Sequence, residues 1–298
     1  MFDGFKHFDI DCDGVNIHGV VGGKGPPLLL LHGYPQTHAM WHKLAPRLSE
    51  TNTIVAADLR GYGKSAKPVS CSDHSPYSKR AMASDMVVLM EQLGHQRFTI
   101  CGHDRGGRVA HRLALDWPDR VEKMVLLDIA PTREMYKHTD DIFAKAYWWW
   151  FYLVQPAPLP ENMIGADPRG YLLTSCGSGS VGLKPFSDDA LAQYLECFDD
   201  PATIHATCED YRAAAGIDIE HDNQDQGKKI ECPVLVVWGK DGVIERCFDA
   251  LSLWQQRASD VTGFAMPGGH YLAEENPEIL YRHLRKFLHS GTLNGNKQ

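Results

Sequence analysis

The stretch CGHDRGGRVAH, residues 101–111, decides the fold and raises the question of function. An apolar strand pattern runs into a glycine-rich turn, and a helical pattern follows at once. Gly102 and Gly106 flank the turn, which needs glycines because backbone packs against backbone there. Asp104 stands at its centre, where a serine hydroxyl is more usual. The pattern predicts a side chain held above the carboxyl edge of a sheet, where open α/β folds bind ligands.

Strand and helix patterns alternate on both sides of this turn. Strands are expected at residues 15–21, 26–33, 97–104, 121–131, 232–242 and 261–270 and at the start of 53–65, and helices at 81–94, 105–118 and from Pro277 onward. Apolar runs that end in glycine suit strands buried on both faces. This alternation predicts a mostly parallel sheet with helices on both faces.

The alternation stops after about residue 132 and resumes at about residue 223. The intervening chain is aromatic, helical in period and interrupted by prolines. We therefore expect one α/β core from residues 1–132 and 223–290, with a helical cap inserted at 133–222. The polar tail, 291–298, is expected to fray.

Composition favours a soluble globular protein, with 43% hydrophobic and 23% charged residues. The formal charge of −8 argues against nucleic-acid binding, and an anionic ligand would need a local positive pocket. The longest apolar run, 146–154, is too short to span a bilayer, and the N-terminus lacks a signal-peptide core. The eight cysteines form no C-x-x-C pair. We expect reduced thiols, a cytoplasmic location, no metal centre and no cofactor.

Two partners for Asp104 follow later in the chain. Asp128 ends the next strand, and His270 ends the last one. Nucleophile, acid and histidine in this order are typical of the catalytic triad of α/β-hydrolases. Asp241, in the loop after the strand that begins at Cys232, is the alternative acid to orient the histidine.

A carboxylate nucleophile favours attack on a saturated carbon. Attack on an ester would give an anhydride, whereas displacement of halide or opening of an epoxide gives a stable alkyl ester. Water activated by His270 can then hydrolyse that ester at the Asp104 carbonyl. The backbone N–H groups of Tyr34, in an early HGYP loop, and of Arg105 are expected to form the oxyanion hole.

Two arginines beside the nucleophile favour one class of substrate. Arg105 follows Asp104, and Arg108 lies four residues after it, on the same helical face. Arginine presents a planar fork that matches a carboxylate. We expect the pair to bind a small anionic substrate, whereas a neutral epoxide needs neither. The alternative is that one arginine only neutralises Asp104 or pairs with an acid elsewhere.

Several longer motifs extend this pattern over roughly residues 15–288. They are GHDRGGRVAHRLALDWPDRV (102–121), HGYPQTHAMWHKLAP (32–46), DLRGYGKS (58–65), LDIAPT (127–132), QPAPLPE (155–161), CEDYRA (208–213) and GGHYLAEENPE (268–278). Together they resemble the haloacetate (fluoroacetate) dehalogenases. The resemblance implies an α/β-hydrolase core with a helical cap, a homodimer, and hydrolysis of carbon–halide bonds in short 2-haloacids.

The resemblance also implies a halide pocket in the cap, made by a histidine–tryptophan pair and a tyrosine. Trp150 and Tyr211 match the tryptophan and the tyrosine, but Trp149 stands where the family has the histidine. Fluoride leaves poorly and needs several short donors. Because the indole is bulkier and offers one N–H, we expect C–Cl and C–Br cleavage to be favoured over C–F cleavage.

Two other functions stay open at this point. An epoxide hydrolase also uses an aspartate nucleophile, and Tyr211 with Tyr147 or Tyr152 could donate to the epoxide oxygen. A non-catalytic ligand-binding protein on a hydrolase scaffold is the third possibility, although such a protein has no need of a complete triad.

Overall fold

The computed structural model describes residues 1–179 and 181–290, so the tail expected to fray lies outside the described residues. Eight strands form one sheet in the order β1-β2-β4-β3-β5-β6-β7-β8. They are β1 (Lys6–Cys12), β2 (Val15–Gly23), β3 (Pro27–Leu31), β4 (Thr53–Ala57), β5 (Phe98–His103), β6 (Val121–Leu127), β7 (Val234–Gly239) and β8 (Val261–Met266). The pairs β1–β2 and β2–β4 are antiparallel and the other pairs are parallel. The predicted α/β class is confirmed.

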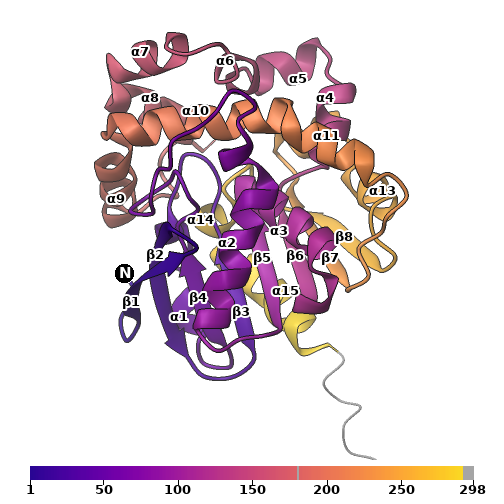
Figure 1. Cartoon of the computed structure of the whole chain (residues 1–298). Helices are drawn as coiled ribbons and strands as arrows, with labels where there is room; N and C mark the ends of the chain where they lie inside the picture. Colours follow the sequence, from indigo (N-terminus) through magenta and orange to yellow (C-terminus); the bar gives the residue numbers. More distant parts are fainter. Residues whose placement is uncertain (180, 291–298) are drawn as a thin grey trace, which may run out of the picture.

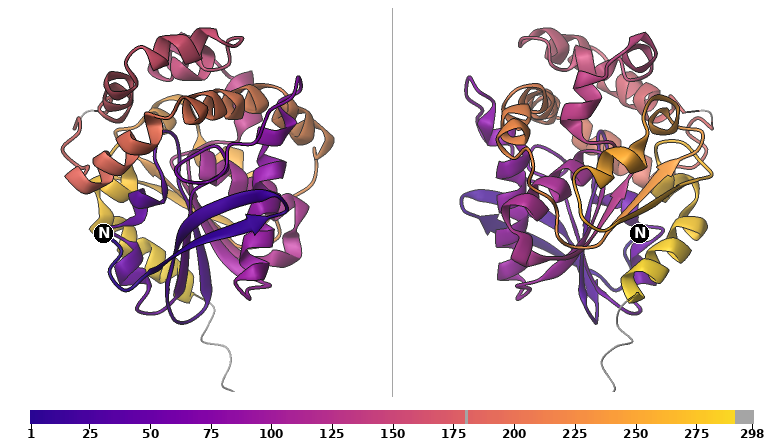
Figure 2. Two further views of the ribbon diagram at one scale, coloured as in Figure 1. Left: turned by 60° about the vertical axis from the view of Figure 1, so that its left-hand side comes forward. Right: turned by 90° about the vertical axis from the view of Figure 1, so that its right-hand side faces the viewer.

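Helices cover both faces of the sheet (Figure 2). The core helices are α1 (Ala45–Leu48), α2 (Lys79–Gln92), α3 (Arg105–Asp116), α12 (Val243–Cys247), α13 (Ala250–Gln255), α14 (Leu272–Glu275) and α15 (Pro277–His289). Strands β5 and β7 are buried along their whole length, as expected for parallel strands inside a sheet that helices cover on both faces. In residues 1–179 and 181–290, no helix has the length and apolar character needed to cross a membrane.

The segment expected to form the cap is helical. It holds α4 (Thr132–Lys137), α5 (Asp141–Ala146), α6 (Trp149–Tyr152), α7 (Leu159–Gly165), α8 (Pro168–Cys176), α9 (Asp188–Phe198), α10 (Pro201–Ala215) and α11 (Ile217–Gln224). Figure 1 shows these helices lying over one end of the sheet, with α10 running between the core and the other cap helices. The carboxyl ends of β5 and β6 point toward this layer. The site therefore lies between the sheet and the cap.

Candidate functional site

Asp104 occupies a strained turn between β5 and α3. Its backbone has φ 43° and ψ −111°, a conformation that residues with a side chain rarely adopt. A Cβ atom on Gly102 would lie 2.3 Å from the Gly106 carbonyl oxygen, and one on Gly106 would lie 2.6 Å from the His32 carbonyl oxygen, so both positions of the turn require glycine. The Asp104 side chain is only 7% exposed. The strain holds the carboxylate in the buried space beneath the cap.

The acid facing the histidine is Asp128. Its Oδ2 lies 2.6 Å from His270 Nδ1, while Oδ1 accepts a hydrogen bond of 2.9 Å from the Gly239 backbone N–H. Asp241, the alternative, is exposed and accepts a 3.3 Å bond from the Gly268 N–H. The structure thus brings Asp104, Asp128 and His270 together at the carboxyl ends of β5, β6 and β8, and places Asp241 outside the group.

Charge tunes the two reactive groups in opposite ways. Burial lowers the pKa of His270, but the hydrogen bond and charge of Asp128, together with the Asp104 charge, raise that pKa above its ordinary value. Burial raises the pKa of Asp104, but His270, Arg108 and Arg105 more than reverse this, so the carboxyl stays ionised. The surrounding charges therefore favour the ionised form of Asp104 and stabilise positive charge on the His270 imidazole.

The expected oxyanion donors lie on either side of Asp104. The Tyr34 N–H donates a 3.1 Å hydrogen bond to Asp104 Oδ2. Helix α3 begins at Arg105, so the Arg105 N–H belongs to the first turn, whose N–H groups have no partner inside the helix. Both donors can stabilise negative charge on a carbonyl oxygen derived from Asp104.

Arg105 is anchored to the cap through an acid that we did not predict. Asp210, on α10, receives hydrogen bonds from Arg105 Nε at 2.8 Å and Nη2 at 2.7 Å. Tyr62 donates to the same carboxylate at 2.6 Å, and the Lys79 ammonium pairs with it. The remaining Arg105 nitrogen, Nη1, is buried without a hydrogen-bond partner. The guanidinium carbon lies 4.1 Å from the centre of the Tyr211 ring.

Arg108, like Arg105, has two side-chain nitrogens that contact the protein and one that has no hydrogen-bond partner. Its Nη1 donates to the Ala130 carbonyl at 3.1 Å and to Thr132 Oγ1 at 2.9 Å, and Nη2 contacts Met135 Sδ at 3.3 Å. Its Nε is buried without a hydrogen-bond partner and lies 3.8 Å from Asp104 Oδ1. Each arginine is therefore fixed by the protein and leaves one buried N–H without a partner. An unpaired buried donor is costly, which is expected where a ligand completes the hydrogen bonding.

A narrow cavity lies above Asp104 and is lined in part by the aromatic run of the cap. Its lining residues are Tyr34, Asp104, Tyr147, Trp149, Trp150, Ser175, His270 and Tyr271. The volume open to water is about 10 Å³, room for roughly one molecule. Of the three expected halide-pocket residues, Trp149 and Trp150 line this cavity. Tyr211 packs against Trp150, with ring centres 6.3 Å apart, and its hydroxyl is buried without a partner.

Four residues of the site had no assigned role in the preferred interpretation of the sequence. Tyr147 places its hydroxyl 3.2 Å from His270 Nδ1. Ser175 and Tyr271 line the cavity, and Asp210 anchors Arg105. Tyr271 directly follows His270, and Asp210 directly precedes Tyr211. Their position next to a predicted site residue was therefore the one signal that the sequence offered for them. Nothing in the sequence around Ser175 marks it.

The raised pKa of His270 should be measurable by NMR. We expect a midpoint above the ordinary 6.5, and a lower midpoint in Asp128→Asn, where the stabilising charge is lost. Because the folded-state pKa is raised, the stability it contributes is complete below the unfolded pKa and is lost as pH rises through the folded pKa. The advantage of the wild type over Asp128→Asn in unfolding free energy should therefore be complete below about pH 6.5 and shrink as the pH rises from there through the folded-state pKa. A wild-type midpoint at or below 6.5 would contradict the raised pKa of His270. The signal that is missing from the spectrum of His270→Gln identifies the His270 resonance.

Asp210 should contribute strongly to stability, since it is fully buried and pairs with two cations. Asp210→Asn should lower the free energy of unfolding by about 3–5 kcal/mol, because it leaves buried charge uncompensated. Urea unfolding measures the loss. Asp218→Asn is the matched control: Asp218 is also buried but pairs with Lys79 and not with Arg105. A loss in Asp210→Asn no larger than in this control would contradict the role of Asp210.

Comparison with known proteins agrees with this geometry. A family model described as the alpha/beta hydrolase fold matches residues 26–277. A fluoroacetate dehalogenase from Burkholderia sp is 47% identical over 97% of this chain and 95% of its own length. A soluble epoxide hydrolase from Corynebacterium sp. (strain C12) is 31% identical, covering 95% and 96%. The crystal structure of ALR0039, a putative alpha/beta hydrolase from Nostoc sp PCC 7120, superposes with a TM-score of 0.96 at 54% identity, covering 97% and 100%. The chain therefore belongs to the alpha/beta hydrolase family and, within it, to the group of the haloacetate (fluoroacetate) dehalogenases.

Proposed function

We propose that this protein is a hydrolase that removes halide from short 2-haloacids through a covalent ester of Asp104. A carboxylate oxygen of Asp104 attacks the carbon that bears the halogen. The new C–O bond forms as the C–X bond breaks, and the halide leaves with the bonding electrons. Water then attacks the Asp104 carbonyl carbon while His270 takes its proton. The products are a 2-hydroxyacid, halide and a proton.

The observation that carries this proposal is the pair of unpartnered N–H groups beside Asp104. Arg105 Nη1 and Arg108 Nε are both buried and both lack an acceptor. A substrate carboxylate supplies two acceptor oxygens, which would satisfy both groups. The reacting carbon of a 2-haloacid is attached directly to that carboxylate, so binding there would hold this carbon near Asp104.

The remaining roles follow from the contacts of each group. Asp128 keeps His270 oriented through the 2.6 Å contact with Nδ1, which leaves Nε2 as the base. The N–H groups of Tyr34 and Arg105 stabilise the oxyanion formed when water attacks the ester. Trp149, Trp150 and Tyr211 receive the halide from the side of the cap.

A single turnover of chloroacetate in oxygen-18 water tests the proposal. We expect stoichiometric chloride release, one labelled oxygen in the Asp104 peptide, and unlabelled glycolate, because the alcohol oxygen comes from Asp104. Mass spectrometry measures both labels. Labelled glycolate with an unlabelled Asp104 would instead mean direct attack by water.

Two variants separate the chemical steps in the same assay. Asp104→Asn should release no chloride, and His270→Asn should release one chloride per site and then stop at the ester. Repeated turnover in either variant would overturn the corresponding role.

We further propose that chloride and bromide leave more readily than fluoride. Trp149 lines the cavity at the position where the resemblance to the haloacetate dehalogenases implies a histidine, a compact imidazole donor. The indole fills more space, and the open volume is already small. Fluoride is the leaving group most dependent on hydrogen bonding, so it should lose most from this replacement.

Replacing Trp149 by histidine should shift this preference. We expect Trp149→His to raise the ratio of fluoroacetate to chloroacetate turnover by at least about tenfold, the effect of one added hydrogen bond to developing charge. Halide-selective electrodes measure both rates. Trp148→His is the control, since Trp148 is 42% exposed and does not line the cavity. An unchanged ratio in Trp149→His, or equal wild-type turnover of both substrates, would refute the preference.

Epoxide hydrolysis is the second candidate, and one contact favours it. The Tyr147 hydroxyl reaches the cavity close to His270 and could protonate an epoxide oxygen, together with the unpaired Tyr211 hydroxyl. Styrene oxide hydrolysis without chloroacetate turnover would support this alternative. Inertness toward both substrates would favour the non-catalytic ligand-binding protein.

The cofactor-free reaction, the homodimer and the cytoplasmic location stay predictions. The first follows from the mechanism, which needs only water, and the second from the resemblance to the haloacetate dehalogenases. The third rests on the cysteine pattern of the sequence.

A further inference from the structure

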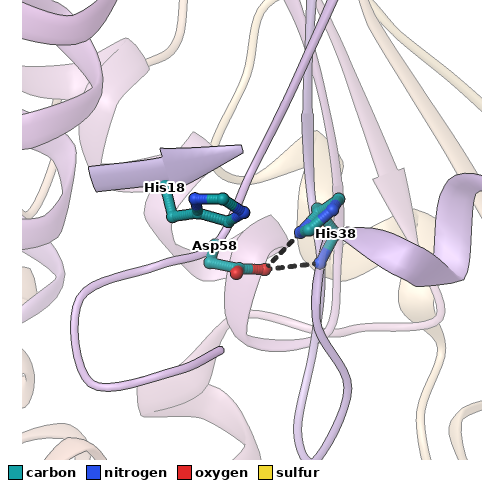
Figure 3. Close-up of side chains that lie close together, drawn as sticks. All are labelled: His18, His38 and Asp58. Atoms are coloured by element: carbon teal, nitrogen blue, oxygen red, sulfur yellow. Dashed lines mark hydrogen bonds and ion pairs between the residues drawn. The ribbon is translucent and has the colours of Figure 1, made fainter. Parts of the chain in front are cut away.

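Two histidines and an aspartate converge at the antiparallel side of the sheet, apart from the lining of the cavity above Asp104 (Figure 3). His18 lies on β2, Asp58 follows β4, and His38 lies on the short 3-10 helix η1 (His38–Trp41). All three side chains are buried, and one ligand atom from each lies within 4.8 Å of the other two. Figure 3 shows the two imidazoles on the same side of the carboxylate.

The hydrogen bonds of the group resemble those around bound metal ions. His18 Nδ1 lies 3.0 Å from Asp9 Oδ1, so an outer carboxylate can hold the ring and leave Nε2 free. Metal-binding histidines commonly have such a carboxylate on their second nitrogen. Asp58 Oδ2 accepts from the Lys64 N–H at 3.0 Å, and Oδ1 accepts from the His38 N–H at 2.7 Å. These backbone bonds fix the Asp58 carboxylate in place.

A third imidazole stands next to the group. The ring of His7 stacks on that of His18 at 5.7 Å between centres and lies 6.5 Å from that of His38. His7 and Asp9 alternate along β1 and so share one face, and Asp9 pairs with His18 in the register of β1 and β2. The hairpin therefore places another imidazole beside the group, outside the three residues whose ligand atoms lie within 4.8 Å of one another.

We propose that His18, His38 and Asp58 bind a divalent transition-metal ion of the Zn²⁺ type, with His7 or water completing the coordination. His38 would bind through Nδ1, replacing the proton that now lies between Nδ1 and Asp58 Oδ1. These two atoms are 2.8 Å apart. Two tetrahedral ligands at about 2.0–2.2 Å from one ion lie about 3.3–3.6 Å apart, so a small side-chain shift would open this contact as the ion enters. Neutral imidazole with carboxylate selects zinc-like ions, whereas Ca²⁺ and Mg²⁺ prefer all-oxygen sites.

This site was not visible in the sequence, where we expected no metal centre. His18, His38 and Asp58 are about twenty residues apart, and they form none of the short ligand spacings that mark zinc sites. The ion would join β2, η1 and the loop after β4. Because His38 lies four residues after Tyr34, it would brace the loop that carries the proposed oxyanion donor.

Zinc binding to the chelator-treated full chain tests the proposal. Calorimetry should give one Zn²⁺ per chain, and Zn²⁺ should raise the melting temperature. His18→Gln should weaken binding at least tenfold, whereas His95→Gln, outside the group, should not. No binding, or equal binding by wild type and His18→Gln, would overturn the site.

Cobalt gives a readout that does not depend on a variant. Co²⁺ in the wild-type chain should show the intense visible bands of a four-coordinate site, and added Zn²⁺ should remove them. A weak six-coordinate spectrum would mean adventitious surface binding and would also overturn the proposal.

Discussion

The backbone of Asp104 is the constraint on which the rest of the site depends. One residue must turn the chain from the end of β5 into the first turn of α3, and it does so at φ 43°. The same turn fixes the start of α3 and hence where Arg105 and Arg108 project. A relaxed turn would move the carboxylate and both guanidinium groups together, so one backbone conformation sets the positions of the proposed nucleophile and of the proposed anion donors.

A buried ion pair between the core and the cap lies next to the strained turn. Arg105 comes from the core and Asp210 from α10, and neither side chain is exposed to solvent. The pair connects α3, the helix that follows Asp104, to the helical layer that covers the site. The position of the cap is therefore coupled to the position of the Arg105 side chain. The aromatic residues of the cap face charged side chains whose positions are fixed by these ion pairs.

The sequence predicts most where the signal is local. Gly102, Asp104 and Gly106 form one short motif, so the turn was readable, and the order of Asp128 and His270 followed from the strand pattern. The choice between Asp128 and Asp241 could not be made from sequence, because both follow parallel strands that end at the same edge. The first strand, β1, was missed because an edge strand with polar residues on one side lacks a continuous apolar run. Asp210 was missed because its partner lies 105 residues away.

The charges around Asp104 have a consequence for the end of the catalytic cycle. Three cations, Arg105, Arg108 and Lys79, face three carboxylates, Asp104, Asp210 and Asp218. A bound substrate anion therefore adds a charge that the site does not neutralise, and both proposed products, halide and hydroxyacid, are anions. Such a site holds its ligands through oriented hydrogen bonds more than through net charge. The charge balance of the site thus favours release of the anionic products and reduces inhibition by them. The same balance makes binding of the anionic substrate weaker.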